Sequence, residues 1–210
     1  MILVTPSGVS VSDRPDPEQL RQAIASGDPV QAMPALTQLR FLEEAEAVPL
    51  LVLGTEQKPF LVRSLSCSGL GYKRNEQGWT VLSRLLGSDD DPNVRAEAAN
   101  ALASYGVERS WPLLRAAFAA DDAWLVRCSI LSALAEQPEI AFSWLLDLAS
   151  MAIDDADGTV RVSGAEILGR LVREADPQGI GDQARSLLRP LQQDADHRVV
   201  AAALNGLQPA

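Results

Sequence analysis

Residues 91–102 read DPNVRAEAANAL, and related stretches return along the chain at a nearly constant interval. The clearest marker is a valine-arginine pair whose arginines lie 32, 32 and 34 residues apart: Arg63, Arg95, Arg127 and Arg161. A weaker copy occupies residues 196–207, where Val200 stands in place of the arginine. Self-similarity at a period of about 20 to 50 residues is typical of stacked supersecondary units. The sequence therefore predicts a repeat array.

Each repeat is expected to contain two helices, A and B, joined by a short acidic turn. Apolar residues such as Val94, Ala98 and Leu102 recur at helical spacing, which predicts one buried face on helix B. Asp91 before Pro92 suits a helix start, because the carboxylate caps the helix and proline has no N–H to leave unpaired. The predicted A helices are residues 48–53, 77–86, 110–119, 141–153 and 183–193. The B helices are predicted to begin near Pro59, Pro92, Ala123, Gly158 and His197.

The turn aspartate, the valine-arginine pair and the small and leucine positions of helix B resemble HEAT repeats over residues 43–207. The resemblance implies an all-α, right-handed α-solenoid of helical hairpins. It also implies a structural ladder between neighbouring repeats, in which arginines bind turn aspartates in the bidentate geometry that suits this pair. The residues carried over to this ladder are Arg63, Arg95, Arg127 and Arg161 with Asp91, Asp122, Asp157 and Asp196.

Domain organisation follows from the repeat. Residues 1–17 are rich in proline, glycine and serine and are predicted to form a flexible tail. Residues 18–210 are predicted to form a single solenoid domain with a degenerate first unit at 18–44. The clear units are expected at about 45–73, 76–106, 108–136, 139–175 and 181–208.

Composition argues against several classes of function. The formal net charge of −10 disfavours binding to nucleic acid. One histidine and two cysteines are too few for a Cys/His metal site, and neither a catalytic constellation nor a nucleotide-binding loop is evident. The chain lacks an apolar run long enough for a transmembrane helix and a convincing signal peptide, so we expect a cytoplasmic protein.

Residues 63–71 (RSLSCSGLG) and 94–99 (VRAEAA) resemble a narrower cyanobacterial group with PBS lyase HEAT-like repeats. That group comprises E/F-type phycobilin lyase subunits and phycobilisome-degradation factors. The resemblance implies a non-catalytic scaffold or adaptor without a cofactor, binding phycobiliproteins or another protein in a concave groove. The alternative is one subunit of a heterodimeric lyase, paired with a second HEAT protein, that attaches a bilin to a phycobiliprotein cysteine. A further alternative is a partner of an iron–sulfur assembly scaffold.

Candidate contact residues fall into three sets. The exposed phase of helix B is predicted to line the groove with Ser68, Asn100, Ser132 and Glu166. The connection that follows the helix B of Arg63 brings together Tyr72, Lys73 and Arg74, which suit an anion or an acidic surface. Trp79 belongs to a series with Trp111 and Trp144 that is either core packing between A helices or an exposed aromatic strip. The acidic turns likewise either cap helices or form a negative rim for a basic partner.

Overall fold

The computed structural model describes residues 15–174 and 179–208. These ranges form twelve α-helices and one short 3-10 helix, with no β-strand. The flexible tail predicted for residues 1–17 lies outside the described residues except at its end, where Asp16 caps the first helix. The A helices are α1 (Pro17–Ala25), α3 (Glu44–Thr55), α5 (Glu76–Ser88), α7 (Val107–Ala120), α9 (Phe142–Ala152) and α11 (Ile180–Leu191). The B helices are α2 (Pro29–Gln38), α4 (Phe60–Lys73), α6 (Pro92–Ala103), α8 (Trp124–Ala135), α10 (Gly158–Arg173) and α12 (His197–Gly206).

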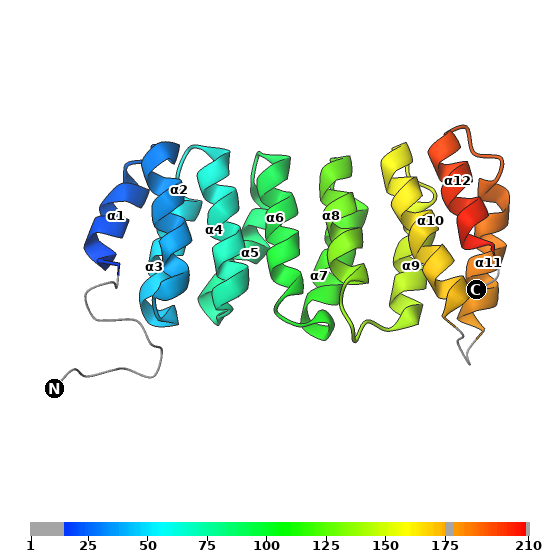
Figure 1. Ribbon diagram of the computed structural model, residues 1–210, viewed down its shortest axis with the longest axis horizontal. Coiled ribbons are helices and arrows are strands. Elements are labelled where there is room, and N and C mark those ends of the chain that lie inside the picture. The colour runs from blue at the N-terminus through cyan, green and yellow to red at the C-terminus, as the bar shows by residue number, and fades with distance from the viewer. Residues whose placement is uncertain (1–14, 175–178, 209–210) are drawn as a thin grey trace. The chain divides into compact units, whose positions relative to one another are not determined.

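The chain forms two compact units, Met1–Tyr105 (unit 1) and Gly106–Ala210 (unit 2), and each contains three hairpins. In unit 1 the B helices α2, α4 and α6 pack side by side, and the A helices α1, α3 and α5 form the second layer (Figure 1). Unit 2 repeats this arrangement, with α10 between α8 and α12, and with α9 against α11 (Figure 1). The predicted fold class, an all-α solenoid of HEAT-like hairpins, is confirmed.

The core of each unit lies between its two helical layers, as the periodicity of helix B predicts. Val62 and Val94 in unit 1, and Val126 and Val160 in unit 2, are completely buried. The valine of each pair therefore fills the core, and the arginine beside it emerges at the turn. The observed B helices begin within one residue of the predicted starts.

The acidic turns contain two kinds of aspartate with different tasks. Asp91 is the N-cap of α6, and its Oδ1 accepts the Asn93 N–H at 2.8 Å. Asp89, two residues earlier, accepts the Asp91 N–H at 2.9 Å and also binds Arg63 in a bidentate pair. The two bonds of that pair are Arg63 Nε to Oδ2 at 2.8 Å and Arg63 Nη2 to Oδ1 at 2.9 Å. One aspartate thus starts the helix, and the other connects neighbouring hairpins.

Unit 2 uses the same arrangement twice. Arg127 pairs with Asp155, and Arg161 pairs with Asp194. In the same turns Asp157 and Asp196 cap α10 and α12. The predicted ladder is therefore wrong in its carboxylates: Asp91, Asp157 and Asp196 are caps, because each is turned toward the amides of its own helix. The sequence aligns Asp122 with these three aspartates, but the N-cap of α8 is Ala123, so Asp122 does not occupy the equivalent position.

Candidate functional site

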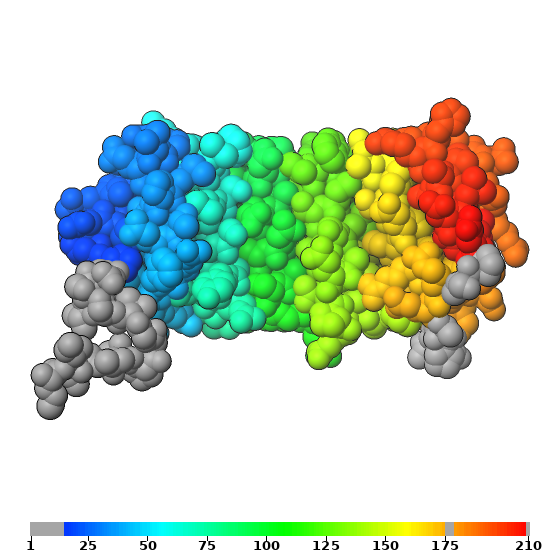
Figure 2. Space-filling view, in the orientation of Figure 1, coloured from blue at the N-terminus to red at the C-terminus, as the bar shows by residue number. Residues whose placement is uncertain are grey.

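In each unit the B helices present exposed polar side chains, and we call this face of either unit its B-helix surface. Ser68 on α4 and Asn100 on α6 are exposed in unit 1, and Ser132 on α8 and Glu166 on α10 are exposed in unit 2. Each lies five residues after the arginine of its repeat and six after the buried valine, about 120° around the helix from that valine. Figure 2 shows the face of unit 1 to which α2, α4 and α6 contribute. The exposed polar groups are thus held on rigid helices.

Glu97 is a member of this surface that the sequence reasoning missed. Its half-buried carboxylate is hydrogen-bonded to the side chains of Ser68 and Asn100. Burial raises the pKa of Glu97, and those two hydrogen bonds oppose the rise. The sequence does contain a sign of it. Glu97 lies two residues after its arginine, a position where the other repeats have the uncharged residues Leu65, Ser129 and Ser163. Unit 1 therefore has an acidic group with two polar neighbours at the centre of its B-helix surface.

The cations of the connection after α4 have roles within the fold. Lys73 Nζ donates to the carbonyl oxygens of Arg40 at 3.1 Å and Leu42 at 2.5 Å, at the end of the 3-10 helix Leu39–Phe41. Arg74 ends α4 in the left-handed conformation, and its Nη1 donates to the Ser104 carbonyl at 3.3 Å. Both cations thus donate to backbone carbonyls, and their predicted role in binding an anion or an acidic surface stays a prediction. Tyr72 is 69% exposed and stays available for contact.

Trp79, Trp111 and Trp144, on the A helices, each contact another aromatic ring. Trp79 is half-buried and meets Tyr105 edge-on, with ring centroids 5.5 Å apart. In unit 2, Trp111 and Trp144 stack in parallel planes with centroids 5.0 Å apart. Trp111 is only 8% exposed. These contacts favour the packing interpretation of the series over the exposed strip.

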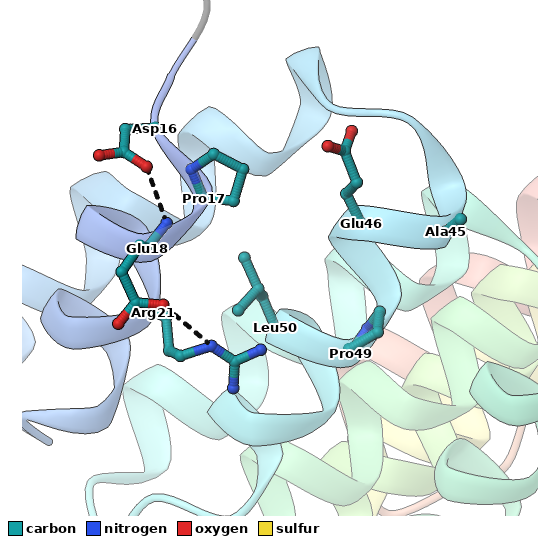
Figure 3. A pocket seen from close by; sticks show the side chains of 8 residues that line it. All are labelled: Asp16, Pro17, Glu18, Arg21, Ala45, Glu46, Pro49 and Leu50. Atoms are coloured by element: carbon teal, nitrogen blue, oxygen red, sulfur yellow. Dashed lines mark hydrogen bonds and ion pairs between the residues drawn. The ribbon is translucent and has the colours of Figure 1, made fainter.

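Open clefts lie between neighbouring helices, and in unit 1 their polar groups already serve the fold. A cleft of about 440 Å³ separates the start of α1 from α3 (Figure 3). There Asp16 caps α1 and Arg21 pairs with Glu18 at 3.7 Å, both side chains of the pair being largely exposed. A second cleft, of about 380 Å³, lies beside the Arg63 pair and is lined partly by Phe60 and Pro92. Neither cleft directs a buried polar group at a ligand.

Three other features were considered for the described part of the chain: a metal site, a reactive thiol and a membrane-spanning helix. No group of three or more histidine, cysteine, aspartate or glutamate side chains there is placed to hold a metal ion. Burial raises the pKa of the Cys67 thiol to about 12, which leaves it protonated and unreactive. None of the described helices combines the length and apolar character needed to cross a membrane.

Comparison with known proteins agrees with this architecture. Residues 48–135 match the family model described as HEAT repeats. The sequence matched none of the curated proteins with which it was compared. This family model covers HEAT repeats in general and does not single out the E/F-type phycobilin lyases. The narrower resemblance to that group is therefore not supported.

Solved structures that resemble the chain are repeat solenoids. YibA of Escherichia coli has a TM-score of 0.66 at 17% identity, covering 92% of this chain and 70% of that protein. Cex1p has a TM-score of 0.66 at 13% identity, covering 90% of this chain and 41% of that protein. A designed armadillo repeat protein, solved in complex with the peptide (KR)4, has a TM-score of 0.55 at 19% identity. It covers 92% of this chain and 100% of the designed protein. The chain is thus a helical-repeat solenoid whose residues 48–135 are similar to HEAT repeats, a fold that suits protein interaction.

Proposed function

We propose that this chain is a non-catalytic scaffold that binds a segment of another protein on its B-helix surface. The observation that carries the proposal is the recurrence of an exposed polar residue at one phase of successive B helices. In unit 1 these residues are Ser68 and Asn100, with the carboxylate of Glu97 between them. Such a row offers hydrogen bonds at regular intervals to an extended backbone, and the fully packed helices beneath require no reorganisation on binding.

The favoured partner segment is basic. The protein carries 28 acidic and 18 lysine or arginine residues, so its field attracts positive charge and speeds encounter with a basic partner. The designed armadillo protein in complex with (KR)4 is an example of a similar solenoid with a basic peptide. The resemblance of residues 63–71 and 94–99 makes a phycobiliprotein the first specific bait to test.

The test uses arginine substitutions at exposed positions on the two layers. Asn100→Arg and Ser132→Arg place a bulky cation on the B-helix surface, whereas Gln77→Arg and Ala116→Arg place the same group at exposed A-helix positions. We expect capture of the bait to weaken about tenfold or more for the B-helix variants only, because the added charge repels a basic segment. Equal binding by all four variants would contradict the proposed surface.

The lyase alternative is separated by absorption spectroscopy with free bilin. We expect no spectral change on mixing, because Lys73 and Arg74 are engaged with backbone carbonyls. A bilin spectrum that shifts with the wild-type chain but not with Lys73→Ala would instead favour a pigment-binding subunit.

A further inference from the structure

The B-helix surface of unit 1 changes in character from its first helix to its third. Large apolar side chains are exposed at equivalent positions of the first two hairpins, 31 residues apart: Val30 and Leu61 where α2 and α4 begin, and Phe41 and Tyr72 where the hairpins end. Val30 is 81% exposed, Phe41 58% and Leu61 45%. The third helix, α6, has no exposed large apolar side chain. An apolar strip therefore lies beside a polar one.

Phe41 and Tyr72 form one end of the apolar strip, and Lys73 contacts both segments. The Lys73 Nζ is 5.5 Å from the centroid of the Tyr72 ring and 3.1 Å from the carbonyl oxygen of Arg40, the residue before Phe41. The Arg40 Cζ lies 4.6 Å from the centroid of the Phe41 ring. Both aromatic residues remain more than half exposed, and such rings offer a large apolar contact area. The two cations beside them disfavour a basic residue at this end of the strip.

Glu97 is the acidic residue of the polar strip, and no cation of the described chain forms an ion pair with it. The other charged residues of α2, α4 and α6 all donate hydrogen bonds within the fold, and these are Arg63, Lys73 and Arg95. The half-buried carboxylate of Glu97 is hydrogen-bonded to Ser68 of α4 and Asn100 of α6. Because side chains of two helices hold it, this carboxylate is pre-organised to accept a charge-assisted hydrogen bond from a partner.

The repeat sets the distance between the aromatic pair and the carboxylate. Glu97 is equivalent to Leu65, 32 residues earlier, and Tyr72 lies seven residues after Leu65 on the same helix. At a rise of about 1.5 Å per residue, Tyr72 is about 10 Å farther along the helix axis than Leu65. Neighbouring helices lie about 8 to 10 Å apart, so Tyr72 and Glu97 are separated by about 14 Å. An extended chain covers that distance in about four residues.

We propose that the B-helix surface of unit 1 binds an extended segment of a partner protein in which an apolar residue and a lysine or arginine lie about four residues apart. The apolar side chain packs on Phe41 and Tyr72, and the cation pairs with Glu97. This inference rests on the proposed scaffold function. It adds an apolar requirement and a spacing to the basic character of the bound segment.

The probes are two fluorescein-labelled peptides that carry the same residues in opposite order, Leu-Phe-Ser-Gly-Ser-Lys-Lys and Lys-Lys-Ser-Gly-Ser-Phe-Leu. Each is titrated with the full chain and followed by fluorescence anisotropy. We expect one order to bind more tightly, because the apolar and acidic contacts lie on different helices. For that peptide, Glu97→Gln and Tyr72→Ser should each raise the Kd about fivefold or more, as expected for the loss of one ion pair or one apolar contact.

Changes in the peptide test whether each contact is made by the expected residue. Replacing both lysines by glutamine should abolish the effect of Glu97→Gln, and replacing Leu-Phe by Ser-Ser should abolish the effect of Tyr72→Ser. The matched control variants are Glu139→Gln and Trp124→Ser, which remove an exposed carboxylate and an exposed aromatic ring from unit 2. We expect both controls to bind as the wild type does.

Three results would overturn the inference. Equal losses for Glu97→Gln and Glu139→Gln would mean attraction to net charge alone. A loss for Glu97→Gln that persists with the glutamine peptide would mean that the lysines do not meet this carboxylate. A chain that dimerises in sedimentation equilibrium, and loses the dimer with Tyr72→Ser, would assign the surface to a second copy of the chain.

The two proposals fail in different ways. If neither Glu97→Gln nor Tyr72→Ser changes the Kd while Asn100→Arg weakens capture of the bait, the inference is wrong and the scaffold proposal stands. The same holds if the bait binds but neither peptide does. If no peptide or bait binds the wild-type chain, both proposals are wrong.

Discussion

Two aspartates that stand two residues apart in the same turn differ in what they do. Asp89 is 5% exposed and holds Arg63, which is 12% exposed, across 26 residues of chain. Asp91 serves its own helix. Both aspartates accept hydrogen bonds, but loss of Asp89 leaves the largely buried Arg63 with only the exposed carboxylate of Asp90 as a charged partner.

Asp89→Asn is therefore expected to lower the free energy of unfolding by about 3 kcal/mol, since Arg63 would lose its buried bidentate partner and keep only the exposed carboxylate of Asp90. Asp91→Ala removes only a cap and should cost about 1 kcal/mol. Urea denaturation followed by circular dichroism measures both. A larger loss for Asp91→Ala would mean that the cap, rather than the pair with Arg63, dominates the stability of this turn.

The same pairs predict loss of stability in acid. Burial raises the pKa of Asp89, but the bonds from Arg63 and the Asp91 amide outweigh it and leave the pKa below its ordinary value. The Arg161 hydrogen bond likewise lowers the pKa of Asp194. A carboxyl whose folded-state pKa is depressed stabilises the fold above its unfolded value of about 4, and this contribution disappears as the pH falls through the folded-state pKa. We expect the Tm to fall below pH of about 4, and to fall less steeply in Asp89→Asn. An identical pH dependence in that variant would contradict a role for this pair.

At the level of elements, B helices approach each other most closely where side chains are smallest. A Cβ on Gly169 of α10 would lie 2.8 Å from the Gly206 Cα of α12. Because that neighbour is backbone, the clash can be relieved only by moving a helix.

Gly169→Ala should accordingly destabilise the protein by about 1 to 3 kcal/mol despite the better helix propensity of alanine. Gly87 in α5 is the matched control, because a Cβ there meets nothing within 4 Å. Gly87→Ala should be neutral or stabilising by up to about 1 kcal/mol. Thermal melts of both variants decide the matter, and stabilisation by Gly169→Ala would show that α10 and α12 are less closely packed.

The buried valine of the repeat tests the face assignment of helix B. Val126 is completely buried in α8, so Val126→Asp introduces a buried charge without a partner. We expect it to lower the free energy of unfolding by about 3 kcal/mol or more. Exposed Ser132 on the same helix offers the control Ser132→Asp, which should change the Tm little. If Val126→Asp melted at the wild-type temperature, Val126 could not face the core, and the assignment of the buried face of helix B would be wrong.

At the level of the whole molecule, the net charge of −10 should oppose folding through self-repulsion. Raising the ionic strength shortens the Debye length from about 10 Å at 0.1 M to about 3 Å at 1 M, which screens exposed charges more than buried pairs. We expect the Tm at neutral pH to rise with added NaCl. A falling Tm would mean that attractive ion pairs outweigh the repulsion.

Repeat spacing and helical periodicity were sufficient to predict the hairpins, the buried valines and the exposed phase of helix B. Ser68 and Asn100 are exposed because each lies six residues after the buried valine of its helix, about 120° around the helix axis from it and away from the face that packs into the core. Glu97 was missed because its hydrogen bond with Ser68 joins two neighbouring helices, α6 and α4, and is not visible in the spacing of either one.

The sequence by itself determined the all-α repeat and the face of each B helix, because both follow from periods along one chain. Only the tertiary structure decided that Asp89 rather than Asp91 holds Arg63, and that Lys73 bonds the Leu42 carbonyl 31 residues away. Contacts at such separations depend on the angle and offset at which hairpins stack, and single-residue differences in turn geometry decide which carboxylate faces which arginine.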